Sequence, residues 1–312
     1  MGLYPKAVEA VLAGIPRGRY SNVYCVDPTN GDDDNPGDRW TQPLASVEAA
    51  EVKCTANQHD VVLYVGSAAG NNLAAALTWD KNLTHLVGMC APTHAAQRAR
   101  IFQTSTLTGA SPLLDVTASG CVFKDFYIFQ GVDDATSLID VRVTGGRNYF
   151  ENVHFAGGGH ATQAVNGGAS LNLSGAEENL FRHCTIGVDT IEAATGMTGI
   201  LFDTAAHRNV FEDCLVTMVA GNAGASFMEI TGAGGISHYN LMRNCDFLNT
   251  GATAMTTALA APAQSASRFL FVKDCMFYGA TKLDANDRGV LMGNMNDVTG
   301  ADTSGVAVEM VT

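Results

Sequence analysis

A short pattern of hydrophobic and polar positions recurs six times between residues 121 and 277 of this chain. In each eight-residue copy the third, sixth and eighth positions are apolar, and the fifth is Asp, Asn or His. The copies are Cys121–Ile128, Asn148–Phe155, Asn179–Ile186, Asn209–Val216, Asn240–Phe247 and Leu270–Phe277. Their first residues lie 27 to 31 positions apart. A period near 30 indicates a solenoid of stacked repeats.

The repeat predicts strands rather than helices. It is rich in Phe, Val, Ile and Cys, is framed by Gly, Asn, Asp and Thr, and has no 3.6-residue apolar stripe. Further short apolar runs lie upstream of the copies, at Leu113–Val116, Leu138–Val143, Leu171–Leu173, Ile200–Phe202 and Phe227–Ile230. Two or three short strands in each turn of about 30 residues predict an all-β parallel β-helix.

Each position of the repeat should form a column of stacked side chains, because parallel strands of neighbouring turns lie ~4.8 Å apart. Positions three, six and eight are then interior columns. Positions six and eight follow the strand period of two, whereas three and six do not, so the chain must bend between them. Position five supplies the bend, since Asp, Asn and His tolerate left-handed backbone conformations. At position one, Asn148, Asn179, Asn209 and Asn240 predict a ladder of stacked amides.

The fourth column should point outward and carries charge. Its residues are Lys124, Glu151, Arg182, Glu212, Arg243 and Lys273, and the sign alternates over the first five. Each neighbouring pair of opposite charges would contribute ~0.2–1 kcal/mol, and less where solvent screens it. We interpret this column as a device that fixes the register of the turns.

Four regions follow from the pattern along the chain. Residues 1–20 are an N-terminal helix or arm, with the helix over Pro5–Ile15, and residues 21–66 contain a first strand, an acidic loop and a capping helix. Residues 67–282 are the parallel β-helix, and residues 283–312 either complete the stack or form an arm. The capping helix, expected over Leu44–Asn57, can cover strand edges at the open end of the solenoid.

Composition and charge narrow the function classes. Hydrophobic residues make up 46% of the chain, enough for a large core. The net charge of −13 argues against duplex nucleic acid or an anionic membrane as a partner. The chain has no run of 18 apolar residues, and Ala7–Ile15, interrupted by Glu9, matches a signal peptide poorly. We therefore expect a cytoplasmic protein whose eight cysteines are free thiols.

The N-terminal hundred residues resemble a known family. Val26–Gly37, followed by Pro43–Ala50 and the strand Asp60–Val65, is similar to the opening segment of pectate-lyase-like right-handed parallel β-helix proteins. The chain also resembles short, non-enzymatic members encoded among tailed-phage virion genes. The resemblance implies a right-handed helix and a virion structural protein, for which capsid decoration or a head appendage is expected. It further implies assembly in the host cytoplasm, other virion proteins as partners, the major capsid protein foremost, and self-association, by analogy as a trimer.

Two polar clusters have alternative interpretations. The acidic loop Asp27–Asp38 offers oxygen ligands for Ca²⁺ but lacks EF-hand spacing, and turns stabilised by Asp and Asn side chains explain it without a metal. The column Cys184, Cys214, Cys245 and Cys275 cannot converge on one zinc ion, because the ligands would lie along a line. Buried free cysteine is the simpler interpretation of that column.

The resemblance also raises an alternative function, a tailspike-like β-helix that binds or depolymerises polysaccharide. Such a hydrolase needs paired carboxylates. Asp213 and Asp274 share the fifth column two turns apart, and His183 precedes Asp213 by one turn. That column is also the bend, where Asp and Asn are expected without catalysis.

Other sequence features weigh against catalysis. The hydrolase signatures of the family are absent: Gly159-His160 lacks a closing Gly, and Asp133-Asp134 has no partner motif. The chain has only six lysines, too few for a long cationic groove, and its two tryptophans, Trp40 and Trp79, lie outside the regular copies. We therefore expect a protein that is not an enzyme and has no catalytic, cofactor-binding or metal site.

Overall fold

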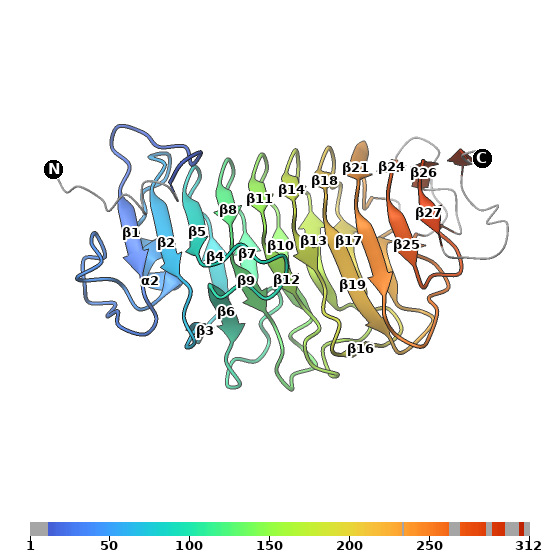
Figure 1. The fold of residues 1–312 in the computed structure, drawn as a ribbon, viewed down its shortest axis with the longest axis horizontal. Helices are drawn as coiled ribbons and strands as arrows, with labels where there is room; N and C mark the ends of the chain where they lie inside the picture. The colour runs from blue at the N-terminus through green and yellow to red at the C-terminus, as the bar shows by residue number, and fades with distance from the viewer. Residues whose placement is uncertain (1–11, 233, 262–268, 285–288, 297–305, 309–312) are drawn as a thin grey trace.

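The computed structural model describes residues 12–232, 234–261, 269–284, 289–296 and 306–308. The chain forms a parallel β-solenoid with about 30 residues in each turn, as the repeat predicts. In each turn the chain passes through three sheets, here called A, B and C, that run side by side along the long axis (Figure 1). Every strand pair of the described residues is parallel, and each turn in the middle of the stack adds one strand to each sheet.

The strands of the three sheets have the following bounds. Sheet A contains, in spatial order, β1 (Val23–Val26), β2 (Val61–Val65), β5 (His85–Met89), β8 (Val122–Lys124), β11 (Tyr149–Glu151), β14 (Leu180–Arg182), β18 (Val210–Glu212), β21 (Tyr239–Arg243), β24 (Phe269–Lys273), β26 (Gly289–Met292) and β28 (Val306–Val308). Sheet B contains β3 (Asn71–Leu73), β6 (Arg100–Gln103), β9 (Tyr127–Phe129), β12 (His154–Ala156), β15 (Thr185–Ile186), β19 (Leu215–Ala220), β22 (Asp246–Asn249), β25 (Met276–Tyr278) and β27 (Met295–Asn296), with β16 (Glu192–Ala193) beside β19. Sheet C contains β4 (Leu77–Trp79), β7 (Leu114–Val116), β10 (Ile139–Val143), β13 (Ala169–Ser174), β17 (Thr198–Asp203), β20 (Ser226–Ile230) and β23 (Leu259–Ala260).

The interior is built from the predicted apolar columns. The third column is aligned through the register of sheet A, and all of its members are buried. The rings of Phe123, Phe150, Phe181 and Phe211 stack with centroid separations of 4.8, 4.6 and 4.5 Å and interplanar angles of 10° or less. This spacing equals the rise between parallel strands, so identical residues in successive turns pack face to face.

The chain bends between sheets A and B at the fifth position of each repeat, where a residue of left-handed conformation was predicted. All six residues of the fifth column have positive φ, between 51° and 58°. They are Asp125, Asn152, His183, Asp213, Asn244 and Asp274. Because one left-handed residue redirects the chain, the third and sixth columns both face the interior although three positions separate them.

The predicted asparagine ladder lines the corner that leads into sheet A. The backbone N–H of Asn148, Asn179 and Asn209 donates to Oδ1 of the ladder asparagine in the next turn, at 2.9, 3.1 and 3.0 Å. The side chains of Asn179 and Asn209 also donate to the next amide oxygen, both at 2.9 Å. All four asparagines, Asn240 included, are buried. The ladder therefore satisfies buried backbone groups at a corner where no strand pairing does so.

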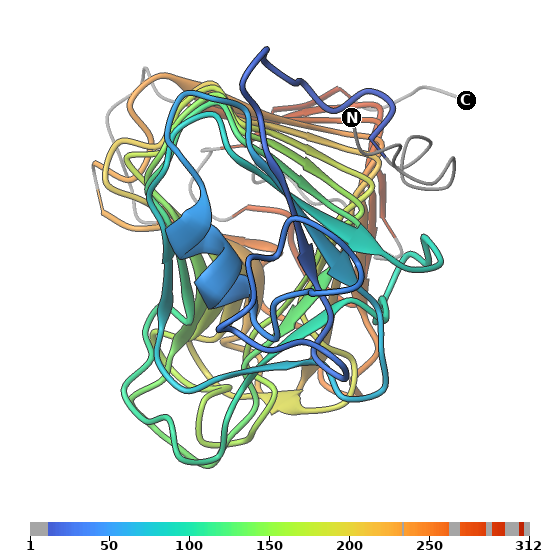
Figure 2. The same ribbon diagram turned by 90° about the vertical axis from the view of Figure 1, so that its left-hand side faces the viewer.

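A single α-helix, α2 (Val47–Lys53), is present in the described residues and lies across the N-terminal end of the stack (Figure 2). Ser46 caps it, since its hydroxyl accepts a hydrogen bond from a first-turn backbone N–H at 3.1 Å. The predicted range Leu44–Asn57 was too long. Its first residue forms a β-bridge with Val26, and Cys54 at the other end is already extended. This helix is too short to span a membrane.

Other local predictions were incomplete. Most of the predicted N-terminal helix lies in residues 1–11, outside the described residues, and residues 12–14 form a turn. The three-residue strands β3 and β4 were not predicted, because such short runs carry no recognisable period. At the C-terminus, β26 and β28 extend sheet A and β27 extends sheet B, so these described strands continue the stack.

Candidate functional site

The residues considered for catalysis occupy the bend. His183 Nε2 lies 3.9 Å from Asp213 Oδ2 in the next turn. Asn244 stands between Asp213 and Asp274, so the strand spacing separates these two carboxylates by roughly 10 Å. The positive φ of each explains an Asp, Asn or His at this position without any reaction.

A loop from residue 90 to residue 99, between β5 and β6, crosses the outer side of sheet B beside the bend. The backbone N–H of Ala96 donates to His154 Nδ1 at 3.0 Å, and the hydroxyl of Thr185 donates to the carbonyl of His94 at 2.6 Å. The buried amide of Gln97 donates to the carbonyl of Asn152 at 2.9 Å. These bonds fix the loop against two successive turns, that of Asn152 and His154 and that of Thr185.

Between this loop and the bend lies a shallow depression of about 400 Å³, here called the bend groove. Its lining residues are Pro92, His94, Lys124, Asp125, Glu151, Asn152 and His183. A second depression, of about 500 Å³, adjoins it and shares Pro92, Lys124 and Asp125. Both signs of charge meet in the groove, which suits a neutral polar ligand better than a polyanion.

Internal contacts occupy most polar groups of the bend groove. Lys124 Nζ lies 2.7 Å from Glu151 Oε2, and the amide of Asn152 donates to Asp125 Oδ1 at 2.7 Å. Burial raises the pKa of Asp125. Burial, together with nearby His183, lowers the pKa of His94. Within the described residues no group of three His, Cys, Asp or Glu side chains is arranged to hold a metal ion.

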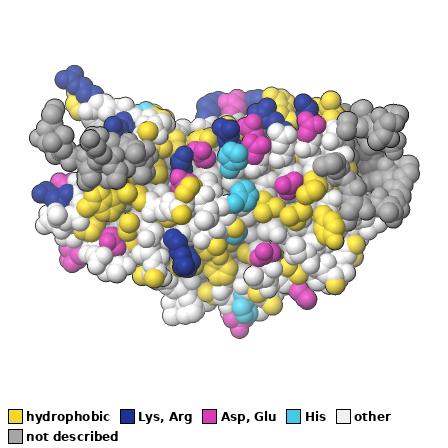
Figure 3. All heavy atoms as spheres, in the orientation of Figure 1, with side chains coloured by type: hydrophobic (Ala, Val, Ile, Leu, Met, Phe, Trp, Pro, Cys, Tyr) yellow, Lys and Arg dark blue, Asp and Glu magenta, His cyan; other side chains and the backbone are white. Residues whose placement is uncertain are grey.

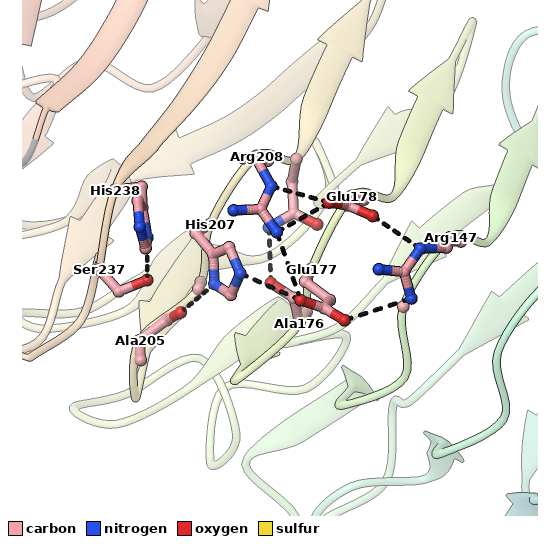
Figure 4. Close-up of polar contacts among 12 residues, drawn as sticks. Arg147, Ala176, Glu177, Glu178, Ala205, His207, Arg208, Ser237 and His238 are labelled. Atoms are coloured by element: carbon pink, nitrogen blue, oxygen red, sulfur yellow. Dashed lines mark hydrogen bonds and ion pairs between the residues drawn. The ribbon is translucent and has the colours of Figure 1, made fainter.

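An ion-pair network covers the opposite corner, between sheets C and A (Figure 4). Arg147 Nε lies 2.7 Å from Glu178 Oε2, and Arg208 Nη2 lies 2.7 Å from Glu178 Oε1. Glu177 contacts both arginines, at 3.4 and 3.6 Å, and its Oε2 lies 3.1 Å from His207 Nε2. The network connects three successive turns and is substantially exposed, so its contribution to stability is modest.

Sequence reasoning missed this network, although a signal was present. Arg147, Glu178 and Arg208 each immediately precede a ladder asparagine, and their signs alternate in the same manner as the fourth column. All three have positive φ, between 55° and 59°. Because opposite charges in neighbouring turns attract each other, the alternation indicates that ion pairs hold the turns in register at this corner as well.

The acidic loop uses its carboxylates within the chain. Asp33 accepts hydrogen bonds from the backbone N–H of Ala45 and Ser46 and from the hydroxyl of Ser46, at 2.8 to 2.9 Å. Asp27 accepts from the backbone N–H of Thr29 at 2.9 Å. The carboxylates thus shape turns and support the start of α2.

The cysteine column is aligned as predicted. Cys184, Cys214, Cys245 and Cys275 lie at equivalent positions between registered strands of sheets A and B, and all are buried free thiols. Burial raises the pKa of Cys214 well above its usual value. All four side chains belong to the hydrophobic core, where a free cysteine behaves as a small hydrophobic residue, so the column serves packing.

The remaining residues that were weighed for catalysis or sugar binding do not come together in one site. Trp79 lies in β4 but is fully buried, and its Nε1 donates to the hydroxyl of Thr84 at 2.9 Å. It therefore offers no outward surface for a sugar. His160 Nδ1 lies 3.7 Å from Asp133 Oδ1 at an exposed loop, and the Asp134 carboxylate accepts from Ser137 and neighbouring groups. The hydroxyl of Ser137 holds the pKa of Asp134 below its usual value.

One buried carboxyl group has no evident structural use. Asp140 in β10 is fully buried, and neither carboxylate oxygen has a hydrogen-bond partner among the described residues. Burial raises the pKa of Asp140 well above its usual value. Burial of a carboxyl group without a hydrogen-bond partner is unfavourable, so the stack carries an energetic cost at this turn.

Comparisons with known proteins identify the fold. No protein-family model matches the sequence, and no curated protein matches it. A rhamnogalacturonan lyase structure is similar with a TM-score of 0.63 and 16% identity, covering 88% of this chain and 74% of that one. The pectate lyase Pel9A gives 0.65 and 14%, with coverages of 96% and 74%. A pectin methylesterase in complex with a hexasaccharide gives 0.61 and 13%, with coverages of 91% and 93%.

These similarities show a pectate-lyase-like parallel β-helix fold and nothing finer, because the identities are low. ORF18 of Geobacillus virus E2 is a more distant structural neighbour, with a TM-score of 0.41 and 12% identity. That likeness is too weak to carry an inference about function.

Proposed function

We propose that this protein is a non-catalytic structural component of a tailed-phage virion, a rigid rod used in capsid decoration or a head appendage. The supporting observation is how its conspicuous polar residues are used. The fifth column makes the bend, the asparagines satisfy buried backbone groups, and ion pairs join successive turns. A chain that uses these groups to hold turns in register is suited to rigidity.

The sequence resemblance to short β-helix proteins of tailed phages supplies the setting. In that setting the protein assembles in the host cytoplasm, associates with itself, and docks onto other virion proteins, the major capsid protein foremost. The described part of the surface in Figure 3 mixes charged side chains of both signs with apolar ones. Such a surface suits protein contacts better than binding to an anionic polymer.

Imaging of particles tests this proposal. Phage that lack the gene should yield particles that miss a surface feature or that open at a lower temperature than wild-type particles. Supplying the purified protein should restore both properties. Particles of unchanged appearance and unchanged thermal stability would contradict the proposal.

A polysaccharide-binding or depolymerising role is the second candidate, and the bend groove is the observation that favours it. His94 and His183 are exposed and present donors and acceptors at an open depression. Incubation of the protein with host surface polysaccharide tests this role. Release of reducing or unsaturated ends, or saturable glycan binding that is lost on His183→Ala, would support it over the structural role.

A further inference from the structure

The outer face of sheet A carries a continuous row of apolar side chains, here called the apolar row. Its members occupy the second position of each repeat and are aligned by the register of the sheet. They are Val122, Tyr149, Leu180, Val210, Leu241 and Phe271. From Tyr149 onward the row is partly exposed, and Tyr239, 45% exposed, extends it sideways near its C-terminal end. Contiguous apolar surface on a folded protein marks an interaction site.

The chain itself covers the N-terminal continuation of this row. Leu12 and Ile15 pack, with Trp40, on the outer side chains of the first strands of sheet A. The covered residues are Val23, Val61, Leu63, Val87 and Val122. This cover reaches as far as Val122 and Tyr149 and does not include the later members of the row. The same face is therefore a packing surface at one end and is open along the rest of the described stack.

A row of charged residues, here called the charge row, runs beside the apolar row, and the sign of charge alternates over its first five members. In order along the stack it contains Lys124, Glu151, Arg182, Glu212, Arg243 and Lys273. Lys124 pairs with Glu151 at 2.7 Å, and Arg243 pairs with Glu212 at 3.0 Å. The four central residues, from Glu151 to Arg243, have the signs minus, plus, minus, plus. Read in the opposite direction along the stack, the same four residues give plus, minus, plus, minus.

That order makes the charge row complementary to an inverted copy of itself. A two-fold axis perpendicular to the stack, between the turns of Arg182 and Glu212, places Arg182 opposite Glu212 of the second copy. It also places Glu151 opposite Arg243 of the second copy. Like charges meet only at the ends, where Lys124 and Lys273 each have a carboxylate of their own chain within 3.6 Å. A two-fold contact is self-complementary and closes after two copies.

A parallel arrangement lacks this complementarity. A two-fold axis along the stack would keep each residue at the height of its own equivalent. With the apolar rows in contact, it would place the two charge rows on opposite flanks of the interface, where they cannot pair with each other.

We propose that two copies of this chain associate antiparallel, with the apolar rows of sheet A forming the centre of the interface and the charge rows its edge. This inference rests on the self-association in the proposed function and specifies its geometry. The apolar row supplies the buried area, and the charge row sets the orientation.

Charge reversal of the purified full chain tests the interface. Sedimentation equilibrium should show a dimer for the wild type. Glu212→Arg should weaken dimerisation at least 10-fold, because two arginines then face each other on both sides of the axis. The double variant Arg182→Glu with Glu212→Arg should recover most of the loss. Glu192→Arg makes the same charge change at an exposed site on β16 and should leave dimerisation unchanged.

Spin-label distances test the orientation. Labels would be placed at Lys124→Cys or at Arg182→Cys in a Cys90→Ser background, since the other seven cysteines are buried. In the antiparallel dimer the two labels at position 124 lie five turns apart, about 24 Å along the stack, and those at 182 only about 5 Å. A longer distance at 124 than at 182 supports the proposal. Equal distances would overturn it.

A monomer or a trimer in sedimentation would also overturn this inference. A monomer would also contradict the self-association in the proposed function. The virion role itself is tested separately, because imaging of particles that lack the protein makes no reference to the dimer. Circular dichroism of each variant separates lost association from lost folding. The double variant serves the same purpose, since a folding defect would not be rescued by a second charge reversal.

Discussion

Replacing one central asparagine of the ladder should destabilise the solenoid far more than replacing an exposed one. Asn209 is the informative position, because it has ladder neighbours on both sides. Its Oδ1 accepts from the backbone and from the side chain of Asn179, at 3.1 and 2.9 Å. Its Nδ2 donates to the carbonyl of Ala176 and to Oδ1 of Asn240, both at 2.9 Å.

The magnitude follows from these four bonds. Asn209→Ala removes all of them and leaves the buried backbone N–H of Asn179 without its acceptor. A neutral hydrogen bond contributes about 1 kcal/mol net, and an orphaned buried donor costs about 1–3 kcal/mol. Three bonds at about 1 kcal/mol each, together with the orphaned donor at about 1–3 kcal/mol, should lower the free energy of unfolding by about 4–6 kcal/mol.

Equilibrium urea unfolding followed by circular dichroism measures this loss, with Asn222→Ala as the control. Asn222 is exposed and accepts one hydrogen bond, from the backbone of Gly224 at 2.9 Å, so its loss should cost less than about 1 kcal/mol. Hydrogen exchange should also accelerate at the Asn179 amide. Equal, small losses for both variants would refute the claim that the ladder satisfies otherwise unpaired groups.

Three further predictions follow from the packing and the buried titratable groups. Phe181→Ala, in the middle of the ring stack, should lower the unfolding free energy by about 3–5 kcal/mol, and a loss below about 1 kcal/mol in urea unfolding would count against face-to-face packing. Burial lowers the pKa of both His85 and His154 to about 4, below the unfolded value of 6.5, so the unfolded chain binds more protons between these values. Stability should therefore fall as pH decreases from about 6.5 to 4, by about 3 kcal/mol per histidine, and a flat urea profile over that window would contradict this. Burial raises the pKa of Asp140, so the native state retains a proton that the unfolded chain releases above about pH 4. Asp140→Asn should raise the unfolding free energy at pH 7 and should remove the loss of stability that Asp140 causes as pH rises above about 4. A variant less stable than the wild type would show that the carboxyl group has an unrecognised partner.

The regular part of the fold could be predicted because every turn of the stack places the same structural requirement on the residue at each position of the repeat. A left-handed bend favours Asp, Asn or His at the same position in every turn. Residues of these types recur at that position, from Asp125 to Asp274, and so reveal the bend in the sequence. Ladder asparagines must likewise recur, since each amide bonds the next. Six repetitions of the same constraint make the pattern visible in a single sequence.

Features that occur once could not be predicted in this way. The strands β3 and β4 have three residues each, and the loop from residue 90 to residue 99 reaches sheet B through contacts far apart in sequence, as between His94 and Thr185. Burial of Trp79 and Asp140 depends on which face of a short strand meets the interior. The bend groove is therefore a product of tertiary contacts and has no motif in the sequence.

Quantitative mass spectrometry of purified virions tests the central claim most directly. A structural role predicts the protein in every preparation, at a fixed number of copies relative to the major capsid protein, through repeated density-gradient purification. Presence in the lysate together with absence from purified virions would contradict the account.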